Sequence, residues 1–278
     1  MVLDFYRTSL PPLVMKPIES WKNPEFLGSP DARILRIISE YLEPQARFKK
    51  FGVDNTIMFW GSARILPPEK AKEALDEAKK SKGDVALAER KVELSRYYAD
   101  AERLAAMITK WSKGLGEGKK QFVVATGGGA AGIMEAANKG ASEAGGKSVG
   151  LGVTLPFEDK LNNYITRELA LQFHYFFMRK FWMVYLAKAL IAFPGGWGTF
   201  DELFEVLTLI QTGKPKKVMP VVLYGSKYWK EVINMEAMAK WGLISPKDLN
   251  LFKICDTPEE AFEYVTSRLT EMYLKDGE

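Results

Sequence analysis

The chain has 278 residues, 47% of them hydrophobic, and its 39 basic and 35 acidic residues give a net charge of +4. This composition allows a sizeable core, and so mild a charge without a basic cluster interleaved with aromatic residues argues against nucleic acid as a partner. Cys255 is the only cysteine and His174 the only histidine, which excludes an internal disulfide and a Cys/His zinc site and fits a reducing cytoplasm.

The hydropathy pattern predicts neither secretion nor membrane insertion. Residues 1–15 carry an aspartate, an arginine and two prolines, so they lack the apolar core of a signal peptide. Residues 173–193 approach membrane length, but Arg179, Lys180 and Lys188 interrupt them, and a strand and turn follow. We expect no membrane partner.

The first part of the chain predicts an accessory layer. Ser29, before a proline and an aspartate, is placed to cap an amphipathic helix that runs to about Leu42 and that Pro44 ends. We therefore expect residues 1–50 to form an N-terminal extension packing on the core, and residues 51–278 to form a single domain.

Beyond this extension, apolar strand-like runs alternate with helical patterns. A charged helical region at 68–113 is broken near 82–84, and we interpret its apolar stripe as packing. A capping box at 257–260 opens a last helix that reaches about Tyr273. The strand-like runs are residues 56–60, 122–125, 148–153, 189–193 and 219–223. Helices or long crossovers separate them, so we predict an α/β fold, Rossmann-like and doubly wound, with a mostly parallel sheet and an N-terminal helical extension.

Three of the predicted strands end in glycine-containing turns. The first turn (residues 61–64) is a weak candidate for a phosphate-side or ribose-side loop; the second turn (residues 126–132) and the third turn (residues 194–199) each lead into a helix. The candidate residues in these turns are Gly61, Ser62, Gly127, Gly128, Gly129, Gly132, Gly195, Gly196, Gly198 and Thr199.

The third turn is the most informative because it is nearly devoid of side chains. Leu203, Val206 and Ile210 recur behind it at helical spacing, so the helix should open near Thr199. Free N–H groups and the helix dipole there favour phosphate or carboxylate. In a doubly wound sheet all three turns emerge near the switch in winding direction, and two anion sites on one sheet indicate a nucleotide.

Two common nucleotide motifs are disfavoured. Gly127, Gly129 and Gly132 formally satisfy G-x-G-x-x-G, but a dinucleotide site also needs an acidic residue about 20 residues on, at the end of the next strand. That strand ends in Thr154-Leu155-Pro156, so the NAD interpretation is weak. Neither turn contains G-K-[ST], which disfavours a Walker-type NTPase.

The motifs resemble the Lonely Guy family of phosphoribohydrolases, long mislabelled as lysine decarboxylases. The family's G-G-G-x-x-G-[IL]-M appears at residues 127–134, its R-K pair as Arg179 and Lys180, and its P-G-G-x-G-T-x-x-E at residues 194–202, with matching spacing. The resemblance covers roughly residues 56–264. Residues 60–64 and 134–137 look like the bacterial branch rather than the plant one, which usually has a glycine in place of Glu135.

The resemblance implies hydrolysis of the N-glycosidic bond of a purine nucleoside 5′-monophosphate, AMP or a cytokinin riboside monophosphate, to free base and ribose 5-phosphate. It implies catalytic roles for Arg179 and Glu202, and substrate binding by Lys180, Thr208 and the turn residues named above. No metal or organic cofactor is implied, and a homodimer or larger homo-oligomer is expected.

Each candidate also has an ordinary structural interpretation. Thr199-x-x-Glu202 is itself a capping box, and before the resemblance is considered, catalysis and capping are about even. Arg179 and Lys180 would otherwise form a snorkelling pair or bind the protein's own carboxylates. Trp197 either covers a base or shields the turn.

Asp201 and Glu135 are best interpreted as partners of helix dipoles, and His174 as a packing histidine.

Two other classes of protein remain open. A non-catalytic nucleotide-binding or signalling protein would keep the pocket without turnover. A lysine decarboxylase would need pyridoxal phosphate on a lysine, for which we find no strand context.

Overall fold

The computed structural model describes residues 17–81, 83–116, 120–156, 160–214 and 219–274. The chain divides into two compact units, Met1–Ser39 and Glu40–Glu278. The expectation that residues 1–15 hold no signal peptide lies outside the described residues.

The described part of the first unit consists of short helical turns. They are η1 (Ser20–Lys22), α1 (Pro24–Gly28), η2 (Pro30–Ala32) and the beginning of α2 (Arg33–Phe51). The Asn23 side chain accepts from the first amides of α1, and Arg36 donates to the carbonyl oxygens of Leu27 and Ser29 at 2.6 Å each. These bonds tie α1 to the first turns of α2.

Helix α2 does not end at Pro44, so that prediction is wrong. The helix continues through the proline to Phe51, with Pro44 and Phe48 buried. Phe48 packs on Trp182 with ring centroids 5.5 Å apart. A proline removes one helical hydrogen bond and crowds the preceding turn, but burial of the following residues in the second unit offsets that cost.

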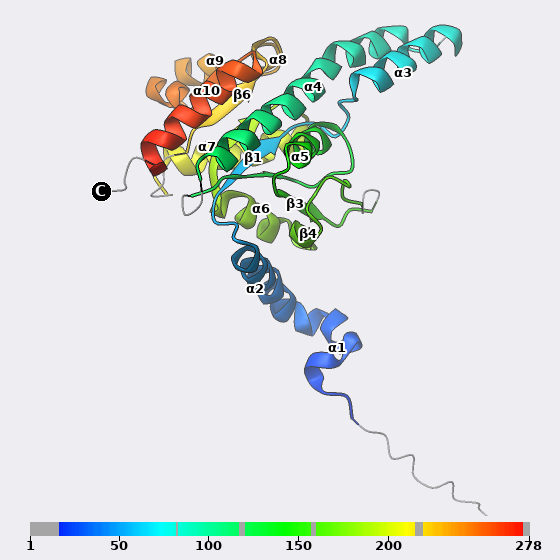
Figure 1. Ribbon diagram of the computed structural model, residues 1–278, viewed down its shortest axis with the longest axis vertical. Coiled ribbons are helices and arrows are strands. Elements are labelled where there is room, and N and C mark those ends of the chain that lie inside the picture. Colours follow the sequence, from blue (N-terminus) through cyan, green and yellow to red (C-terminus); the bar gives the residue numbers. More distant parts are fainter. Residues whose placement is uncertain (1–16, 82, 117–119, 157–159, 215–218, 275–278) are drawn as a thin grey trace, which may run out of the picture. The chain divides into compact units, whose positions relative to one another are not determined.

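The second unit is built on a seven-stranded sheet in which every pairing is parallel (Figure 1). Its order is β4-β3-β2-β1-β5-β6-β7. The strands are β1 (Thr56–Trp60), β2 (Val123–Thr126), β3 (Ser148–Val153), β4 (Ala170–Phe173), β5 (Ala187–Ala192), β6 (Val221–Tyr224) and β7 (Lys253–Cys255). This confirms the doubly wound, Rossmann-like α/β prediction.

Helices connect these strands. They are α3 (Pro68–Ser81), α4 (Val85–Gly114), α5 (Gly132–Glu143), α6 (Phe176–Tyr185), α7 (Trp197–Gln211), α8 (Ser226–Val232), α9 (Met235–Lys240) and α10 (Pro258–Leu269), with short turns η3 (Arg167–Leu169), η4 (Pro246–Asn250) and η5 (Thr270–Leu274). The break predicted near 82–84 separates α3 from α4, where Asp84 accepts from the amide of Leu87. The stripe on α4 is core, as predicted: Tyr97, Tyr98, Ala101, Leu104 and Ile108 are all buried.

The strand residues alternate between the two faces of the sheet. Ile57 and Phe59 of β1 belong to the core cluster that α4, α5 and α10 cover, whereas Met58 between them is buried but faces the other way. Parallel crossovers are right-handed, so connections that move in opposite directions from β1 place their helices on opposite faces. Figure 1 shows α6 across the sheet from α4 and α5.

Strand β1 lies at the switch in winding direction. It pairs with β2 on one side and β5 on the other, with Phe59 opposite both Thr126 and Ile191. The chain therefore leaves β1, β2 and β5 at one edge of the sheet, in neighbouring positions. This confirms that the three glycine turns emerge together, where ligands bind in such folds.

None of the helices within the described residues combines the length and apolar character that crossing a membrane requires.

Gly140→Ala tests the close contact between α4 and α5. A Cβ atom at Gly140 would stand 1.9 Å from the backbone oxygen of Glu102, which cannot swing aside. Alanine normally stabilises a helix interior by about 1 kcal/mol relative to glycine. Here we expect overpacking to lower the free energy of unfolding by about 1–3 kcal/mol, measured by urea unfolding.

Gly114→Ala is the matched control, because a Cβ atom at this helical glycine of α4 meets nothing within 4 Å. We expect its free energy of unfolding to stay unchanged or to rise slightly. Equal losses in the two variants would contradict the steric explanation.

Candidate active site

The first turn is a scaffold between the other two. The Ser62 amide donates to the Pro194 oxygen at 3.0 Å, and the Ser62 oxygen accepts from the Ile133 amide at 3.2 Å. A Cβ atom on Gly132, whose φ is +72°, would come within 2.2 Å of that same Ser62 oxygen, and one on Gly61 would strike Ile133. Packing between turns therefore requires these two glycines, and substrate binding by Gly61 and Ser62 stays a prediction.

The second turn has its carbonyl groups tied back into the protein. The Gly128 amide donates to Thr126 Oγ1 at 2.9 Å, and the Gly128 and Gly129 oxygens accept from Asn162 at 3.2 and 3.0 Å. Gly128 has a φ of +74°, which glycine adopts readily. The Gly129 N–H donates to no acceptor among the described residues.

A small pocket opens beside this second turn, at the carboxyl ends of β2, β3 and β4. Arg179 of α6 forms one wall. The other lining residues are Gly127, Gly129, Met134, Gly152, Val153, Leu155, Lys160, Leu161 and Gln172. The pocket thus combines the backbone N–H of Gly129 with a guanidinium, which suits an anion.

The third turn enters α7 earlier than predicted. The helix begins at Trp197 rather than near Thr199, and its N-cap is Gly196, with no side-chain cap. Tyr228 donates its hydroxyl to the Gly195 oxygen and holds the turn. Cβ atoms on Gly196 and Gly198 would meet nothing within 4 Å. The approach to the first N–H groups of α7 is therefore open.

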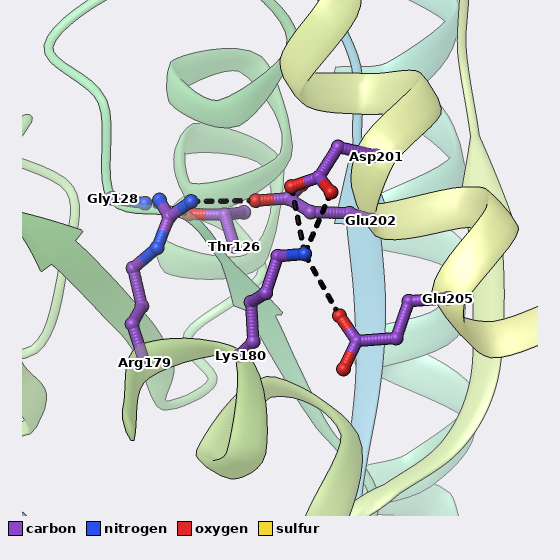
Figure 2. Close-up of polar contacts among 7 residues, drawn as sticks. All are labelled: Thr126, Gly128, Arg179, Lys180, Asp201, Glu202 and Glu205. Carbon is purple, nitrogen blue, oxygen red and sulfur yellow. Dashed lines mark hydrogen bonds and ion pairs between the residues drawn. The ribbon is translucent and has the colours of Figure 1, made fainter. Parts of the chain in front are cut away.

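Arg179 and Glu202 form a buried ion pair between α6 and α7, which Figure 2 shows with the two groups pointing toward each other. Arg179 Nη2 lies 2.7 Å from Glu202 Oε1, and the side chains are only 13% and 11% exposed. Since Gly196 is the N-cap and Glu202 binds a guanidinium, the capping-box interpretation is wrong. The helix begins two residues before Thr199, and this removes the geometry that the capping box needs.

Burial raises the pKa of Glu202 from 4.5 to about 7. The nearby Arg179 and Lys180 lower it, while the carboxylates of Asp201 and Glu205 raise it further. Desolvation outweighs the attraction of a single guanidinium, so this carboxyl group changes its charge near neutral pH. Such a pKa suits a group that exchanges protons during a reaction.

Arg179 has donors that the protein does not use. Its Nη2 binds Glu202, but its buried Nε has no partner among the described residues. The guanidinium stands 5.5 Å from the centroid of the Phe176 ring, and Nη1 lies 3.6 Å from the place of a Cβ atom on Gly127. Arg179 thus lies against both the second turn and α7.

Lys180 binds the protein's own carboxylates, as its ordinary interpretation holds. Its Nζ lies 2.7 Å from Asp201 and 3.0 Å from Glu205, both on α7 (Figure 2). Burial alone would lower the pKa of Lys180, but these hydrogen bonds outweigh it and raise the pKa. A substrate-binding role for Lys180 stays a prediction, and Asp201 is a partner of this lysine as well as of the helix dipole.

Other candidates lie apart from this pair. Thr208 is exposed further along α7 and lines a separate apolar pocket with Phe204 and Leu207. His174 follows an edge strand and is exposed, but its ring packs edge-to-face on Tyr175 with centroids 4.7 Å apart. Its backbone N–H binds Glu40. Trp197 is 92% exposed and shields nothing.

Glu135 lies in the first turn of α5, as the dipole interpretation requires, and also accepts from the Tyr98 hydroxyl at 3.2 Å. Sequence reasoning missed Asn138, Asn162 and Tyr228, which hold the glycine turns. Asn138 alone had a signal, as a neutral polar residue directly after the apolar residues Ala136 and Ala137 of a helical pattern.

The fold and the site define a Rossmann-like protein with a small pocket, lined in part by glycines, beside an arginine–glutamate pair. Residues 134–265 match the family described as "Possible lysine decarboxylase". A cytokinin riboside 5′-monophosphate phosphoribohydrolase of Rhodococcoides fascians is 35% identical over 95 residues, which cover 34% of this chain and 48% of that protein. The match thus spans about half the length of this relative. Both matches agree with the resemblance to the Lonely Guy family that the motifs carry.

Solved structures with a similar chain path include two molybdenum cofactor proteins. The carrier protein of Chlamydomonas reinhardtii is 18% identical, with 78% of this chain and 99% of that chain covered and a TM-score of 0.47. The binding protein of Rippkaea orientalis is 20% identical, with 77% and 96% covered and a TM-score of 0.45. Similarity this low transfers no activity to the chain.

Glu202→Gln tests the raised pKa. The folded-state pKa of this carboxyl group exceeds its unfolded value of 4.5, so the group contributes stability at pH values below 4.5. This contribution is lost as the pH rises through about 7. We expect the free energy of unfolding of the wild type, minus that of Glu202→Gln, to fall between about pH 5 and about pH 8, by at most about 1.4 kcal/mol per pH unit. Urea unfolding at several pH values measures this difference, and a flat or rising difference would contradict the raised pKa.

Proposed function

We propose that the protein hydrolyses the N-glycosidic bond of a purine nucleoside 5′-monophosphate, AMP or a cytokinin riboside monophosphate. The products are the free base and ribose 5-phosphate. The observation that carries the proposal is the buried Arg179–Glu202 pair, placed beside two turns with unused N–H groups. The family and the activity of the Rhodococcoides fascians relative support it.

The 5′-phosphate binds at the second and third turns in this proposal. Gly127 and Gly129 line the pocket, and Gly196 and Gly198 leave the beginning of α7 open. Backbone N–H groups at a helix N-terminus favour an anion, and the unused Nε of Arg179 adds a charged donor. Arg179 thereby orients the phosphate and ribose. Gly128, Gly132, Gly195, Thr199 and the first turn support these positions.

Glu202 acts on the ribose. In the reaction, the bond between ribose C1′ and the base nitrogen breaks with its electron pair on the base, and a water oxygen bonds to C1′. The water loses one proton, and the base takes up one proton to leave as the free base. A glutamate carboxylate stabilises the positive charge that develops on the ribose or accepts the proton of the attacking water. Sugar hydrolases divide comparable tasks between two carboxylates. Here Glu202 is paired with an arginine instead.

The remaining parts of the proposal concern binding and assembly. Lys180 and Thr208 contact substrate, which for Lys180 means exchanging part of its bonding to Asp201 and Glu205. Exposed aromatic side chains on α6, such as Phe177 and Tyr185, support assembly into a homodimer or larger oligomer. A cytoplasmic location agrees with the lone cysteine.

The first test is turnover of AMP in the presence of a chelator. We expect release of adenine and ribose 5-phosphate without added metal, and much slower reaction of adenosine, which cannot use the anion-binding turns. Chromatography of the products measures both rates. Equal rates for AMP and adenosine would refute the role of the turns, and tight AMP binding without base release would favour a nucleotide-binding or signalling protein.

Glu202→Gln separates a catalytic carboxylate from a structural one. The amide keeps the size of the side chain and a contact to Arg179 but removes the negative charge. We expect kcat for AMP to fall about a hundredfold, equivalent to about 3 kcal/mol, with the Kd for AMP much less changed.

In the wild type, kcat/KM should fall as the pH drops below about 7, because Glu202 then takes up a proton.

Glu205→Gln is the matched control. It removes a carboxylate from the same helix, one that binds Lys180 rather than Arg179. We expect its kcat to stay within a few-fold of the wild type. If Glu202→Gln, folded and binding AMP, turned over at the same rate as Glu205→Gln, the catalytic assignment would be wrong.

A further inference from the structure

A fully bonded asparagine lies at the centre of a buried polar network behind the pocket. Asn138 of α5 is 0% exposed. Its Oδ1 accepts from Thr126 Oγ1 at 2.7 Å and from Asn162 Nδ2 at 2.9 Å, and its Nδ2 donates to Ser148 Oγ at 2.5 Å and the Val149 oxygen at 3.1 Å. Both donors and both acceptor positions of the amide are therefore used.

The network continues to the second turn by two routes. Thr126, at the end of β2, donates a hydrogen bond from its hydroxyl to Asn138 and accepts one from the Gly128 amide at 2.9 Å. Asn162 donates its backbone N–H to the Gly128 oxygen and its side-chain Nδ2 to the Gly129 oxygen, at 3.2 and 3.0 Å. Both polar backbone groups of Gly128 are thus held by the network.

This arrangement sets the direction of a free N–H group. The Gly128 carbonyl and the Gly129 N–H belong to one peptide bond, and in a trans peptide they point in opposite directions. No cis peptide occurs in the described residues. Because Asn162 holds the Gly128 oxygen, the Gly129 N–H points away from Asn162, and Gly129 lines the pocket that Arg179 shares.

The network also accounts for the choice of residue types. Thr126, Asn138 and Ser148 are 0% exposed and Asn162 is 7% exposed, so these polar groups are shielded from water. A buried polar network specifies one arrangement because every member loses its partners if the backbone shifts. Apolar side chains could fill the same space without fixing the orientation of a glycine turn, whose backbone is otherwise free to rotate.

We propose that Thr126, Asn138 and Asn162 are positioning residues that hold the second turn with its Gly129 N–H presented to the phosphate of the ligand. This inference rests on the proposed function, because it deepens the role of the second turn. It assigns the affinity for phosphate partly to residues that touch no substrate. Variants of the network should therefore lose phosphate binding while they keep the fold.

The test measures binding as well as turnover. Isothermal titration calorimetry gives the Kd of ribose 5-phosphate and of AMP for the wild type, Asn162→Ala and Thr126→Val. We expect the two variants to bind both compounds about tenfold or more weakly, since small displacements of a binding group have large effects. KM for AMP should rise by a similar factor, with kcat less affected, and KM for adenosine should not change.

Two matched variants separate positioning from stability. Thr126→Ser keeps the hydroxyl that joins Gly128 to Asn138, so it should restore the affinity lost in Thr126→Val. Asn55→Ala removes another buried asparagine, 6% exposed, which donates to the Gln121 oxygen just before β2 at the opposite edge of the sheet. It should lower the thermal unfolding temperature without changing the Kd of ribose 5-phosphate.

The outcomes distinguish this inference from the proposed function. Folded Asn162→Ala and Thr126→Val with wild-type Kd for ribose 5-phosphate would overturn the inference and leave the hydrolysis intact. Wild-type protein that binds ribose 5-phosphate but releases no base from AMP would overturn the hydrolysis, and the Kd ratios would still decide the inference. Equal losses of affinity for AMP and adenosine would show that the network has only a structural role and would overturn the inference. An equal loss of affinity in Asn55→Ala would do the same.

Discussion

The buried ion pair between Arg179 and Glu202 is the interaction on which the arrangement of the site depends. It joins the helix before β5 to the helix after it, at 2.7 Å, with both side chains nearly removed from solvent. An unpaired charge at either position would be costly, so each residue holds the other in place. The pairing is incomplete, because burial still raises the pKa of Glu202 to about 7 and Arg179 Nε has no partner in the described part of the chain. Arg179 can still donate a hydrogen bond and Glu202 can still exchange a proton, so the pair is suited to receive a ligand.

The topology of the sheet supplies the surroundings of this pair. Because β1 lies between β2 and β5, the turns that follow these strands are neighbours, although more than sixty residues separate the second turn from the third. The first turn joins them through the amide and the oxygen of Ser62. Any ligand at the switch point therefore meets backbone from two turns and side chains from α6 and α7.

The glycines of these turns serve two different purposes. Gly61 and Gly132 are required because another part of the protein occupies the space of a Cβ atom, whereas Gly196 and Gly198 border open space. Only glycines of the second kind leave space for a ligand to contact the turn. The G-x-G-x-x-G pattern therefore overstates the number of ligand contacts, since Gly132 packs against Ser62. The pattern also gives no indication of the buried asparagines that orient the turn, because they lie outside it in the sequence.

The sequence by itself determined the features that depend on neighbours along the chain. Apolar runs placed five of the seven described strands, glycine turns marked the ends of three of them, and the motifs indicated the family. The short edge strands β4 and β7, the continuation of α2 through Pro44 and the beginning of α7 at Trp197 were decided by tertiary structure. So was the partner of Glu202, which lies 23 residues away on another helix. Local patterns carry propensity and spacing, but burial and the groups that meet in space depend on contacts between distant segments, and these contacts outweigh propensity where they conflict.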